Sequence, residues 1–265
     1  MTRTKRQSFD SNSRGVFITA TDTGVGKTVV TAALAVSLRT SGYKVGVMKP
    51  IETGIRSSAD AQSDAARLRS AAGSKDSLTE IRPYVFRVPL APMEAARLEK
   101  KTITLSTIMR TIRTVQSRHE IVIIEGVGGV YVPIISSFTI ADLIYHMKYD
   151  ALVVGRVGLG GINHALLTLE ALRRRNIRVL ALVLNRPLPA QTATARAQER
   201  STVKVLGQQA GVPVVGPLPY RVGLERNFQN EVRRLSNTTA IKNLARLVLA
   251  SGRGAILRRR RYPEP

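Results

Sequence analysis

A lysine and a threonine that follow two closely spaced glycines can bind a phosphate group. Residues 16–31 read V-F-I-T-A-T-D-T-G-V-G-K-T-V-V-T. In a phosphate-binding loop, glycines let several backbone N–H groups point at one anion, and the dipole of the following helix adds to the attraction. The Lys27 ammonium would then reach the outer phosphates, and the Thr28 hydroxyl would be placed to bind Mg²⁺.

The residues on either side of this loop predict the strand and the helix that a phosphate-binding loop requires. Residues 16–19 are β-branched or aromatic and predict a short buried strand, and the alanine-rich run 29–38 predicts a helix. The usual spacing, G-x-x-x-x-G-K-[ST], would place a glycine where this chain has Thr21. The alternative is a helix that merely begins G-K-T after a strand. The flanking elements favour a nucleotide-binding loop.

Short apolar runs alternate with helical patterns along the rest of the chain. Runs rich in Val, Ile and Leu occupy residues 44–49, 121–125, 151–155, 179–185 and 214–218. Helical patterns occupy residues 60–72, 104–118, 139–148, 162–175, 191–210 and 237–251. Uninterrupted apolar runs are typical of strands buried on both faces of a parallel sheet. The alternation predicts a single α/β domain with a doubly wound, mostly parallel sheet flanked by helices, whose ligands lie at the carboxyl ends of the strands.

Charged residues follow two of the predicted strands. Lys49 ends the second strand, and Glu125 ends the 121–125 run before the sequence G-V-G-G. A carboxylate at the end of a buried strand is costly unless it faces a cation or a ligand, and beside a phosphate-binding loop that cation is most simply Mg²⁺. A helix-capping or solvated acid is the alternative for Glu125. Asp60 or Asp64 would complete the metal shell, unless each is only a helix acid favoured by the dipole.

Two later segments are also candidates for ligand binding. The glycines of residues 158–161 open a predicted helix, which suggests an anion site made of backbone amides. His164, in the same segment, has no partner spaced for a metal, and we expect it to be structural. Asn185 ends the 179–185 run and can offer a donor and an acceptor to a base edge, or it shapes the turn before Pro187.

The composition narrows the class of protein. The chain has 265 residues, no cysteine, and 41 Lys and Arg against 18 Asp and Glu, a net charge of +23. The absence of cysteine removes disulfides, thiolate metal sites and a Cys nucleophile, and it fits a cytoplasmic enzyme. No apolar run approaches the roughly 18 residues of a membrane span, and the polar start lacks the apolar core of a secretory signal. The basic surface would attract polyanions, but aromatic residues are few, so we expect neither a specific nucleic-acid partner nor a membrane.

Part of the positive charge lies at the two ends of the chain. Residues 1–14 form a basic, polar segment, and residues 253–265 contain the run from Arg258 to Arg261. We expect both to be disordered tails around a folded domain of residues 15–252.

Several sequence blocks together resemble the dethiobiotin synthetases. Residues 21–28, T-D-T-G-V-G-K-T, resemble the loop of that family, which carries one residue more than the ordinary pattern. Four further blocks resemble it in the same order, namely K-P-I-E-T-G (49–54), E-G-V-G-G (125–129), F-T-I-A-D-L (138–143) and G-L-G-G-I-N-H-A-L-L-T (158–168). The resemblance covers most of the chain.

The resemblance implies an ATP- and Mg²⁺-dependent enzyme that joins CO₂ or bicarbonate to 7,8-diaminononanoate to make dethiobiotin. One amine becomes a carbamate, the carbamate takes the γ-phosphoryl group of ATP, and the second amine closes the ring with loss of phosphate. Such chemistry needs positioning and charge neutralisation more than a protein nucleophile. The resemblance also implies a homodimer, in which the loop around residues 160–163 of one subunit receives the substrate's tail carboxylate in the other.

The resemblance assigns a role to each candidate residue. Lys27 and Lys49 would be catalytic and neutralise charge on the phosphoryl group and the carbamate. Thr28, Asp64 and Glu125 would hold Mg²⁺. The substrate would contact Thr23, Thr53, Gly128, Gly160, Gly161, Ile162 and Asn163. The nucleotide would contact Asp22, Thr23, Gly24, Val25, Gly26, Lys27, Thr28, Val29, Glu125, Asn185, Pro217 and Pro219.

Two other classes of protein share parts of this pattern. A partitioning or positioning ATPase would bind DNA or membrane through its basic surface, but its loop carries an additional lysine where this chain has Thr21, Asp22 and Thr23. A cobyrinate amide synthase needs a glutaminase cysteine, and this chain has none. The sequence therefore favours the synthetase.

Overall fold

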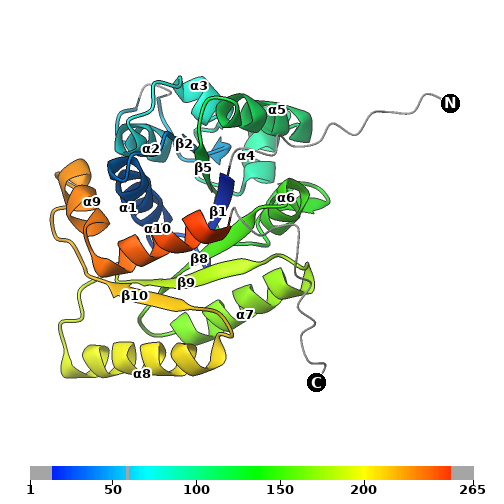
Figure 1. Cartoon of the computed structure of the whole chain (residues 1–265). Helices are drawn as coiled ribbons and strands as arrows, with labels where there is room; N and C mark the ends of the chain where they lie inside the picture. Colours follow the sequence, from blue (N-terminus) through cyan, green and yellow to red (C-terminus); the bar gives the residue numbers. More distant parts are fainter. Residues whose placement is uncertain (1–13, 58–59, 252–265) are drawn as a thin grey trace.

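A six-stranded parallel sheet forms the centre of the computed structural model, which describes residues 14–57 and 60–251 (Figure 1). Its strand order is β10-β9-β8-β1-β5-β2, and every neighbouring pair is parallel. The strands are β1 (Arg14–Ala20), β2 (Val45–Met48), β5 (Ile121–Glu125), β8 (Asp150–Arg156), β9 (Val179–Asn185) and β10 (Val214–Leu218). Except for Arg14, which begins β1, the two tails expected from the sequence lie outside the described residues.

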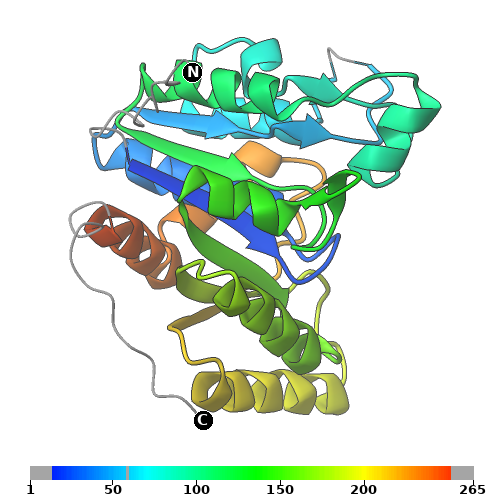
Figure 2. The same cartoon turned by 90° about the vertical axis from the view of Figure 1, so that its right-hand side faces the viewer.

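Helices cover both faces of this sheet (Figures 1 and 2). One face is covered by α1 (Lys27–Thr40), α2 (Asp64–Ala72), α9 (Phe228–Ser236) and α10 (Thr239–Ser251). The other is covered by α4 (Pro92–Leu98), α5 (Leu105–Gln116), α6 (Ile140–Met147), α7 (Gly161–Arg174) and α8 (Ala193–Gln209). The predicted doubly wound α/β fold is confirmed.

The strand β1 shows why the central strands are apolar throughout. Successive side chains of a strand point to opposite faces. Val16 and Ile18 therefore pack in the core beneath α1, whereas Phe17 packs in the core beneath α6 and α7. All three are fully buried, because both faces of the sheet are covered.

Several short elements were not predicted from the sequence. They are the parallel pair β3 (Ile51–Glu52) and β4 (Tyr84–Val85), the antiparallel pair β6 (Pro133–Ile135) and β7 (Phe138–Thr139), and the helices α3 (Leu78–Ile81), α4 and α9. The two-residue strands are too short to show a periodicity, whereas α9 carries Phe228, Val232 and Leu235 at helical spacing, a signal that the prediction did not use. The helix predicted from residue 60 begins instead at Asp64, because the Ser63 hydroxyl accepts the N–H of Ala66 and caps it there.

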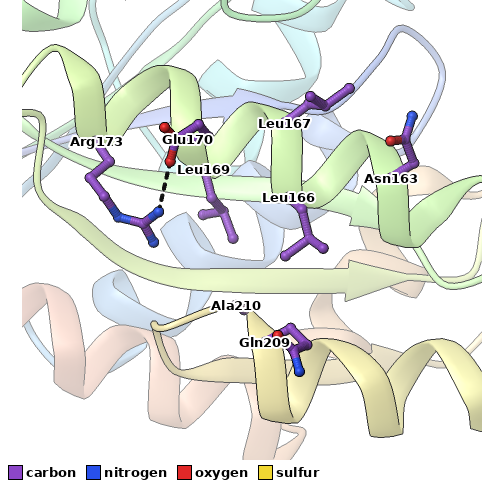
Figure 3. A pocket seen from close by; sticks show the side chains of 8 residues that line it. All are labelled: Asn163, Leu166, Leu167, Leu169, Glu170, Arg173, Gln209 and Ala210. Carbon is purple, nitrogen blue, oxygen red and sulfur yellow. Dashed lines mark hydrogen bonds and ion pairs between the residues drawn. The ribbon is translucent and has the colours of Figure 1, made fainter. Parts of the chain in front are cut away.

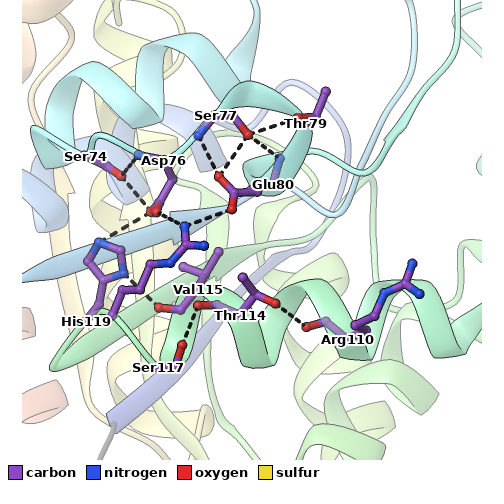
Figure 4. Close-up of polar contacts among 11 residues, drawn as sticks. Ser74, Asp76, Ser77, Thr79, Glu80, Arg110, Thr114, Val115, Ser117 and His119 are labelled. Atoms are coloured by element: carbon purple, nitrogen blue, oxygen red, sulfur yellow. Dashed lines mark hydrogen bonds and ion pairs between the residues drawn. The ribbon is translucent and has the colours of Figure 1, made fainter.

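A polar cluster fastens the amino ends of β2 and β5, opposite the end where ligands are expected (Figure 4). The buried carboxylate of Asp76 accepts hydrogen bonds from the Ser74 hydroxyl at 2.8 Å and from the Arg118 guanidinium at 3.1 Å. The Nε2 atom of His119 lies 3.4 Å from the same carboxylate. The cluster ties the segment before α3 to the turn before β5.

At the carboxyl ends, β1 and β8 send the chain to opposite faces of the sheet. β1 leads into α1 on one face, and its neighbour β8 leads into α7 on the other. Ligands of doubly wound sheets bind at the crevice that such a divergence creates. In the described part of the chain, no helix combines the length and the apolar character that crossing a membrane requires.

Candidate functional site

The predicted phosphate-binding loop joins β1 to α1 and is built around two glycines with positive φ. Gly24 has φ 74° and Gly26 has φ 99°, values that only glycine adopts readily. No side chain caps α1, and no acidic residue lies in its first turn. The first N–H groups of the helix are therefore available to an anion. A Cβ atom on Gly26 would clash with the amide nitrogen of Asn185, so the loop packs tightly against the end of β9.

Lys27 is the first residue of α1, and it is 7% exposed. Its ammonium donates to the carbonyl oxygen of Asp22 at 3.3 Å, so the side chain curls back over the loop. Burial, followed by repulsion from Lys49, lowers the pKa of Lys27 to about 8. A lysine in this position readily gains an anionic partner, because its charge is incompletely compensated in the ligand-free protein.

A buried carboxylate lies beside the start of α1. Glu125 ends β5 and is fully buried. Its Oε1 atom accepts hydrogen bonds from the Lys49 ammonium at 2.5 Å and from the Thr28 hydroxyl at 2.9 Å. Its Oε2 atom is buried and has no hydrogen-bond partner among the residues that the structure describes. The structure thus brings together three residues that the sequence placed at three separate strand or helix ends.

Asp64 completes this group, and Asp60 does not. The Oδ2 atom of Asp64 lies 2.9 Å from the Lys49 ammonium, whereas Asp60 accepts the N–H of Gln62 at 2.8 Å on the surface. Burial opposes the charge on Lys49, but the carboxylates of Glu125 and Asp64 outweigh it and raise the pKa of Lys49. Burial would raise the pKa of Asp64, but Lys49 more than offsets it, so that pKa is lowered. Both groups are charged at neutral pH.

The oxygens at this centre suit Mg²⁺. The unpartnered Oε2 of Glu125, the Thr28 hydroxyl and the Asp64 carboxylate are hard donors of the kind that Mg²⁺ prefers. Among residues 14–57 and 60–251, no three His, Asp or Glu side chains gather closely enough to hold a metal by themselves. This fits an ion that takes its remaining ligands from nucleotide phosphates and water.

A second ion pair, which the sequence did not predict, positions Asp64. Glu52 in β3 is paired with Arg82 at 2.5 Å, and both side chains are buried. The Oε1 atom of Glu52 also accepts the N–H of Asp64 at 2.5 Å. Glu52 therefore holds the start of α2, and with it the carboxylate that meets Lys49. The only sequence signal was an acidic residue inside the K-P-I-E-T-G block.

The predicted substrate residues fall into separate groups. Gly128 has φ 62°, and a Cβ atom placed there would lie 3.8 Å from the Thr23 hydroxyl, so the loop after β5 lies against the phosphate-binding loop. Thr53 is half-buried just beyond β3. In the described part of the chain no hydrogen bond joins Thr53 to the phosphate-binding loop.

The third group of predicted substrate residues lies at the start of α7. Gly160 has φ 79° and caps the helix, and Gly161 packs so closely on the carbonyl of Arg156 that a Cβ atom would clash with it. Ile162 is half-buried and Asn163 is exposed. Asn163 is also at one end of a cavity of about 280 Å³ between α7 and α8 (Figure 3). This cavity runs along α7 and does not include the phosphate-binding loop.

The predicted base-binding residues lie next to one another. Asn185 pairs with Leu218 across β9 and β10, which puts it beside Pro217 and Pro219. The Asn185 amide donates to the carbonyl of Val25 at 2.9 Å. Asn185 therefore also supports the phosphate-binding loop, and its carbonyl oxygen and second amide hydrogen are left for another partner.

Known proteins resemble this chain in sequence and in fold. A family model described as an AAA domain matches residues 14–227. The ATP-dependent dethiobiotin synthetase BioD of Thermodesulfovibrio yellowstonii is 39% identical, over 86% of this chain and 95% of the relative. The enzyme of the same name from Anaeromyxobacter sp. (strain Fw109-5) is 40% identical, over 74% of this chain and 87% of the relative.

The solved structures that resemble the chain are more distant. A ParA family ATPase from Chlorobium tepidum has a TM-score of 0.53 at 14% identity and covers 91% of this chain and 99% of its own. The cell division protein MinD of Aquifex aeolicus has a TM-score of 0.54 at 18% identity, over 90% and 98%. At these identities the likeness concerns the fold alone. The sequence comparison is decisive, and the chain belongs to the family of ATP-dependent dethiobiotin synthetases.

Proposed function

We propose that the protein is a cytoplasmic ATP-dependent dethiobiotin synthetase. It carboxylates 7,8-diaminononanoate with CO₂ or bicarbonate, closes the cyclic urea of dethiobiotin, and releases ADP and phosphate. The observation that carries the proposal is the meeting of Lys27, Lys49 and Glu125 at one end of the sheet, beside an uncapped helix start, in a chain of this family.

Lys27 and Lys49 neutralise negative charge on different groups of the reactants. Lys27 turns from the Asp22 carbonyl to the γ-phosphate, where its charge offsets the negative charge that develops during phosphoryl transfer. Lys49, which its two carboxylate partners keep protonated, faces the carbamate and the transferred phosphoryl oxygens. Thr28, Asp64 and Glu125 would hold Mg²⁺, which would supply further positive charge to the phosphoryl transfer. No side chain needs to act as a nucleophile.

The reacting amines lie between the phosphate-binding loop and the loop after β5. The Thr23 hydroxyl binds the diamine or its carbamate, and Gly128 leaves room for the substrate to approach. Thr53 contributes a second hydroxyl from the segment after β3. Holding amine, carbamate and phosphoryl group in one orientation supplies most of the acceleration in such a reaction.

The substrate's tail carboxylate binds at the start of α7 of a second subunit. The Gly161 N–H donates to the carbonyl of Gly158, and the N–H groups of Ile162 and Asn163 follow it at the start of a helix whose first turn has no acidic residue. The protein is therefore a homodimer in this proposal, and each site combines residues of two chains. The adenine binds beside Asn185, between Pro217 and Pro219 on one side and the phosphate-binding loop on the other.

A partitioning or positioning ATPase is the second candidate, because the fold resembles ParA and MinD and the net charge is +23. The residues at 21–23 argue against it, since Thr21, Asp22 and Thr23 occupy the place of that group's additional lysine.

One experiment distinguishes the two functions. Phosphate release from Mg²⁺–ATP and bicarbonate is measured with and without 7,8-diaminononanoate, and the product is identified by mass spectrometry. The synthetase releases phosphate only with the diamine and yields the cyclic urea. A rate of ATP hydrolysis that does not change with the diamine but increases with DNA or lipid would establish the positioning ATPase instead.

A further inference from the structure

An arginine at the end of β8 forms an ion pair with the phosphate-binding loop. The Nη2 atom of Arg156 lies 2.6 Å from the Oδ2 atom of Asp22. The two residues are far apart in sequence, and they meet where β1 and β8 send the chain to opposite faces of the sheet. The proposed function gives Arg156 no role.

Asp22 is a negative charge inside a loop that is otherwise suited to anions. Its Oδ1 atom accepts the N–H of Thr23 at 2.7 Å, and its carbonyl oxygen accepts the Lys27 ammonium at 3.3 Å. A triphosphate bound to this loop would therefore be close to a carboxylate. The Asp22 carboxylate and the phosphates would repel each other, because both are negatively charged and water screens them only in part. The carboxylate needs a compensating cation that stays in place when Lys27 turns to the nucleotide.

Arg156 meets that need and is itself held firmly. Its backbone carbonyl is in contact with Gly161, so the start of α7 packs directly on it. Its Nε atom is buried and has no hydrogen-bond partner in the described part of the chain. The guanidinium therefore retains an unpaired donor after its contact with Asp22 is made.

We propose that Arg156 is a positioning residue for the nucleotide, which neutralises Asp22 and holds the carboxylate turned toward the Thr23 N–H. The inference rests on the proposed function only in that the loop binds a nucleoside triphosphate. Arg156 acts through Asp22, and through the carbonyl contact with Gly161 it also joins the phosphate-binding loop to the start of α7.

The expected size of the effect is moderate. The side chains of Arg156 and Asp22 are 35% and 44% exposed, so water screens the pair. We therefore expect the loss of Arg156 to weaken nucleotide binding about two- to fivefold, which is the upper part of the range for exposed charge pairs.

The test measures the binding of a fluorescent ATP analogue with Mg²⁺, together with the KM for ATP and kcat. Arg156→Gln should raise the dissociation constant and the KM for ATP by this factor, with a smaller change in kcat. Arg156→Lys should bind more tightly than Arg156→Gln, because it keeps the charge. The double variant D22N/R156Q should recover most of the affinity, since the unbalanced carboxylate is gone. Arg174→Gln, which removes an exposed arginine paired with Glu170 on the same helix, is the matched control and should bind as the native protein does.

Two results would overturn the inference. One is an Arg156→Gln variant with native affinity and a lowered melting temperature, which would make the pair structural only. The other is a double variant that binds the nucleotide as weakly as Arg156→Gln does, which would show that Arg156 does not act through Asp22. The binding measurement needs no diamine. A native protein that binds the nucleotide but makes no dethiobiotin would therefore refute the proposed function and leave this test intact.

Discussion

Two buried lysines of the site have pKa values that move in opposite directions. Burial and the neighbouring Lys49 lower the pKa of Lys27 to about 8, whereas two carboxylates raise the pKa of Lys49. Lys49 therefore carries a permanent charge, and the charge of Lys27 depends on what binds beside it. A phosphate bound next to Lys27 would raise the pKa of the Lys27 ammonium. The protein would then take up a proton when it binds the nucleotide.

Nucleotide binding should weaken as the pH rises above about 8, because Lys27 then loses its charge in the free protein. Stability of the free protein should change in the opposite sense. Between pH 8 and the ordinary lysine pKa of 10.5, the unfolded chain holds a proton that the folded chain has released, so stability rises with pH across this window. Calorimetric titrations with Mg²⁺–ATP at several pH values test the first statement. An affinity independent of pH up to 10 would contradict it.

Lys27→Ala should lower turnover about a hundredfold or more, the loss expected when a group that meets developing charge is removed. Diamine-dependent phosphate release is the measurement. Lys204→Ala, at an exposed lysine of α8, is the control and should retain native turnover. Near-native activity of Lys27→Ala would refute the assignment of the loop.

Asp64→Asn should raise the Mg²⁺ concentration needed for half-maximal activity by at least about tenfold, since one of the proposed oxygen ligands loses its charge. Asp60→Asn is the matched control, because the Asp60 carboxylate accepts the N–H of Gln62 on the surface and, in the described part of the chain, forms no ion pair with Lys49. The Mg²⁺ dependence of both variants is measured at saturating ATP. Equal shifts would mean that the contact between Asp64 and Lys49 does not mark the metal site.

At the scale of the elements, the sequence predicted the long strands well and the short elements poorly. The runs 121–125, 179–185 and 214–218 match β5, β9 and β10 in full. β5 and β9 are covered on both faces and are therefore mostly apolar, whereas β10 is a half-buried edge strand that its two valines and its leucine still marked. The helix α9 was missed although Phe228, Val232 and Leu235 recur at helical spacing, because three apolar residues in nine make a short pattern. The two-residue strands β3 and β4 leave no periodic signal.

The residues of the site show the same difference between features that are local in the sequence and contacts that form only when the chain folds. Lys27 and Thr28 could be predicted because glycine spacing and a helix start are local features. The choice between Asp60 and Asp64 depended on which one reaches Lys49, and that contact is made only in the folded chain. The pairs of Glu52 with Arg82 and of Arg156 with Asp22 join segments whose proximity no spacing reveals.

Gly26→Ala should abolish nucleotide binding, because φ at this position is 99° and the added methyl group would clash with Asn185. Gly207→Ala is a control within α8, where a Cβ atom meets nothing within 4 Å. The control should raise the free energy of unfolding by roughly 0.5–1 kcal/mol, as alanine does in an exposed helix. Binding of the fluorescent ATP analogue and denaturant unfolding test both variants. Native nucleotide affinity in Gly26→Ala would show that the loop is not held as tightly as the structure indicates.

The whole molecule shares its architecture with ParA and MinD, and a few residues at the ends of the strands account for a different proposed reaction. The same sheet supports other activities because ligands contact the loops and not the core. Two features of the whole molecule can therefore be tested, namely the proposed dimer and the arginine-rich residues 253–265.

Mixing two inactive variants should restore activity if each site combines two subunits. Lys27→Ala disables the phosphate-binding loop, and Asn163→Asp places a negative charge where the substrate carboxylate would bind. After subunit exchange, about half of the dimers are mixed and have one intact site of two, so turnover should reach about a quarter of native. Light scattering establishes the oligomeric state. A monomer, or a mixture without activity, would refute the shared site.

Removal of residues 253–265 should leave kcat and KM unchanged, because the sequence places every proposed catalytic and binding residue before them. The truncated chain should also bind heparin more weakly, since it loses the arginine run 258–261. Steady-state kinetics and elution from a heparin column are the measurements. A large fall in kcat would give the tail a part in the reaction.

The position of β1 in the sheet has a consequence for synthesis on the ribosome. β1 leaves the ribosome before β5 and β8, which begin at Ile121 and Asp150 and are its two neighbours in the described sheet. Until both have emerged, the segment that carries the phosphate-binding loop lacks these neighbours and exposes the apolar side chains of Val16, Phe17 and Ile18. Parallel pairings over such sequence separations form slowly. The nascent chain therefore has a long interval in which chaperones compete with aggregation, and nucleotide can stabilise the fold only after that interval ends.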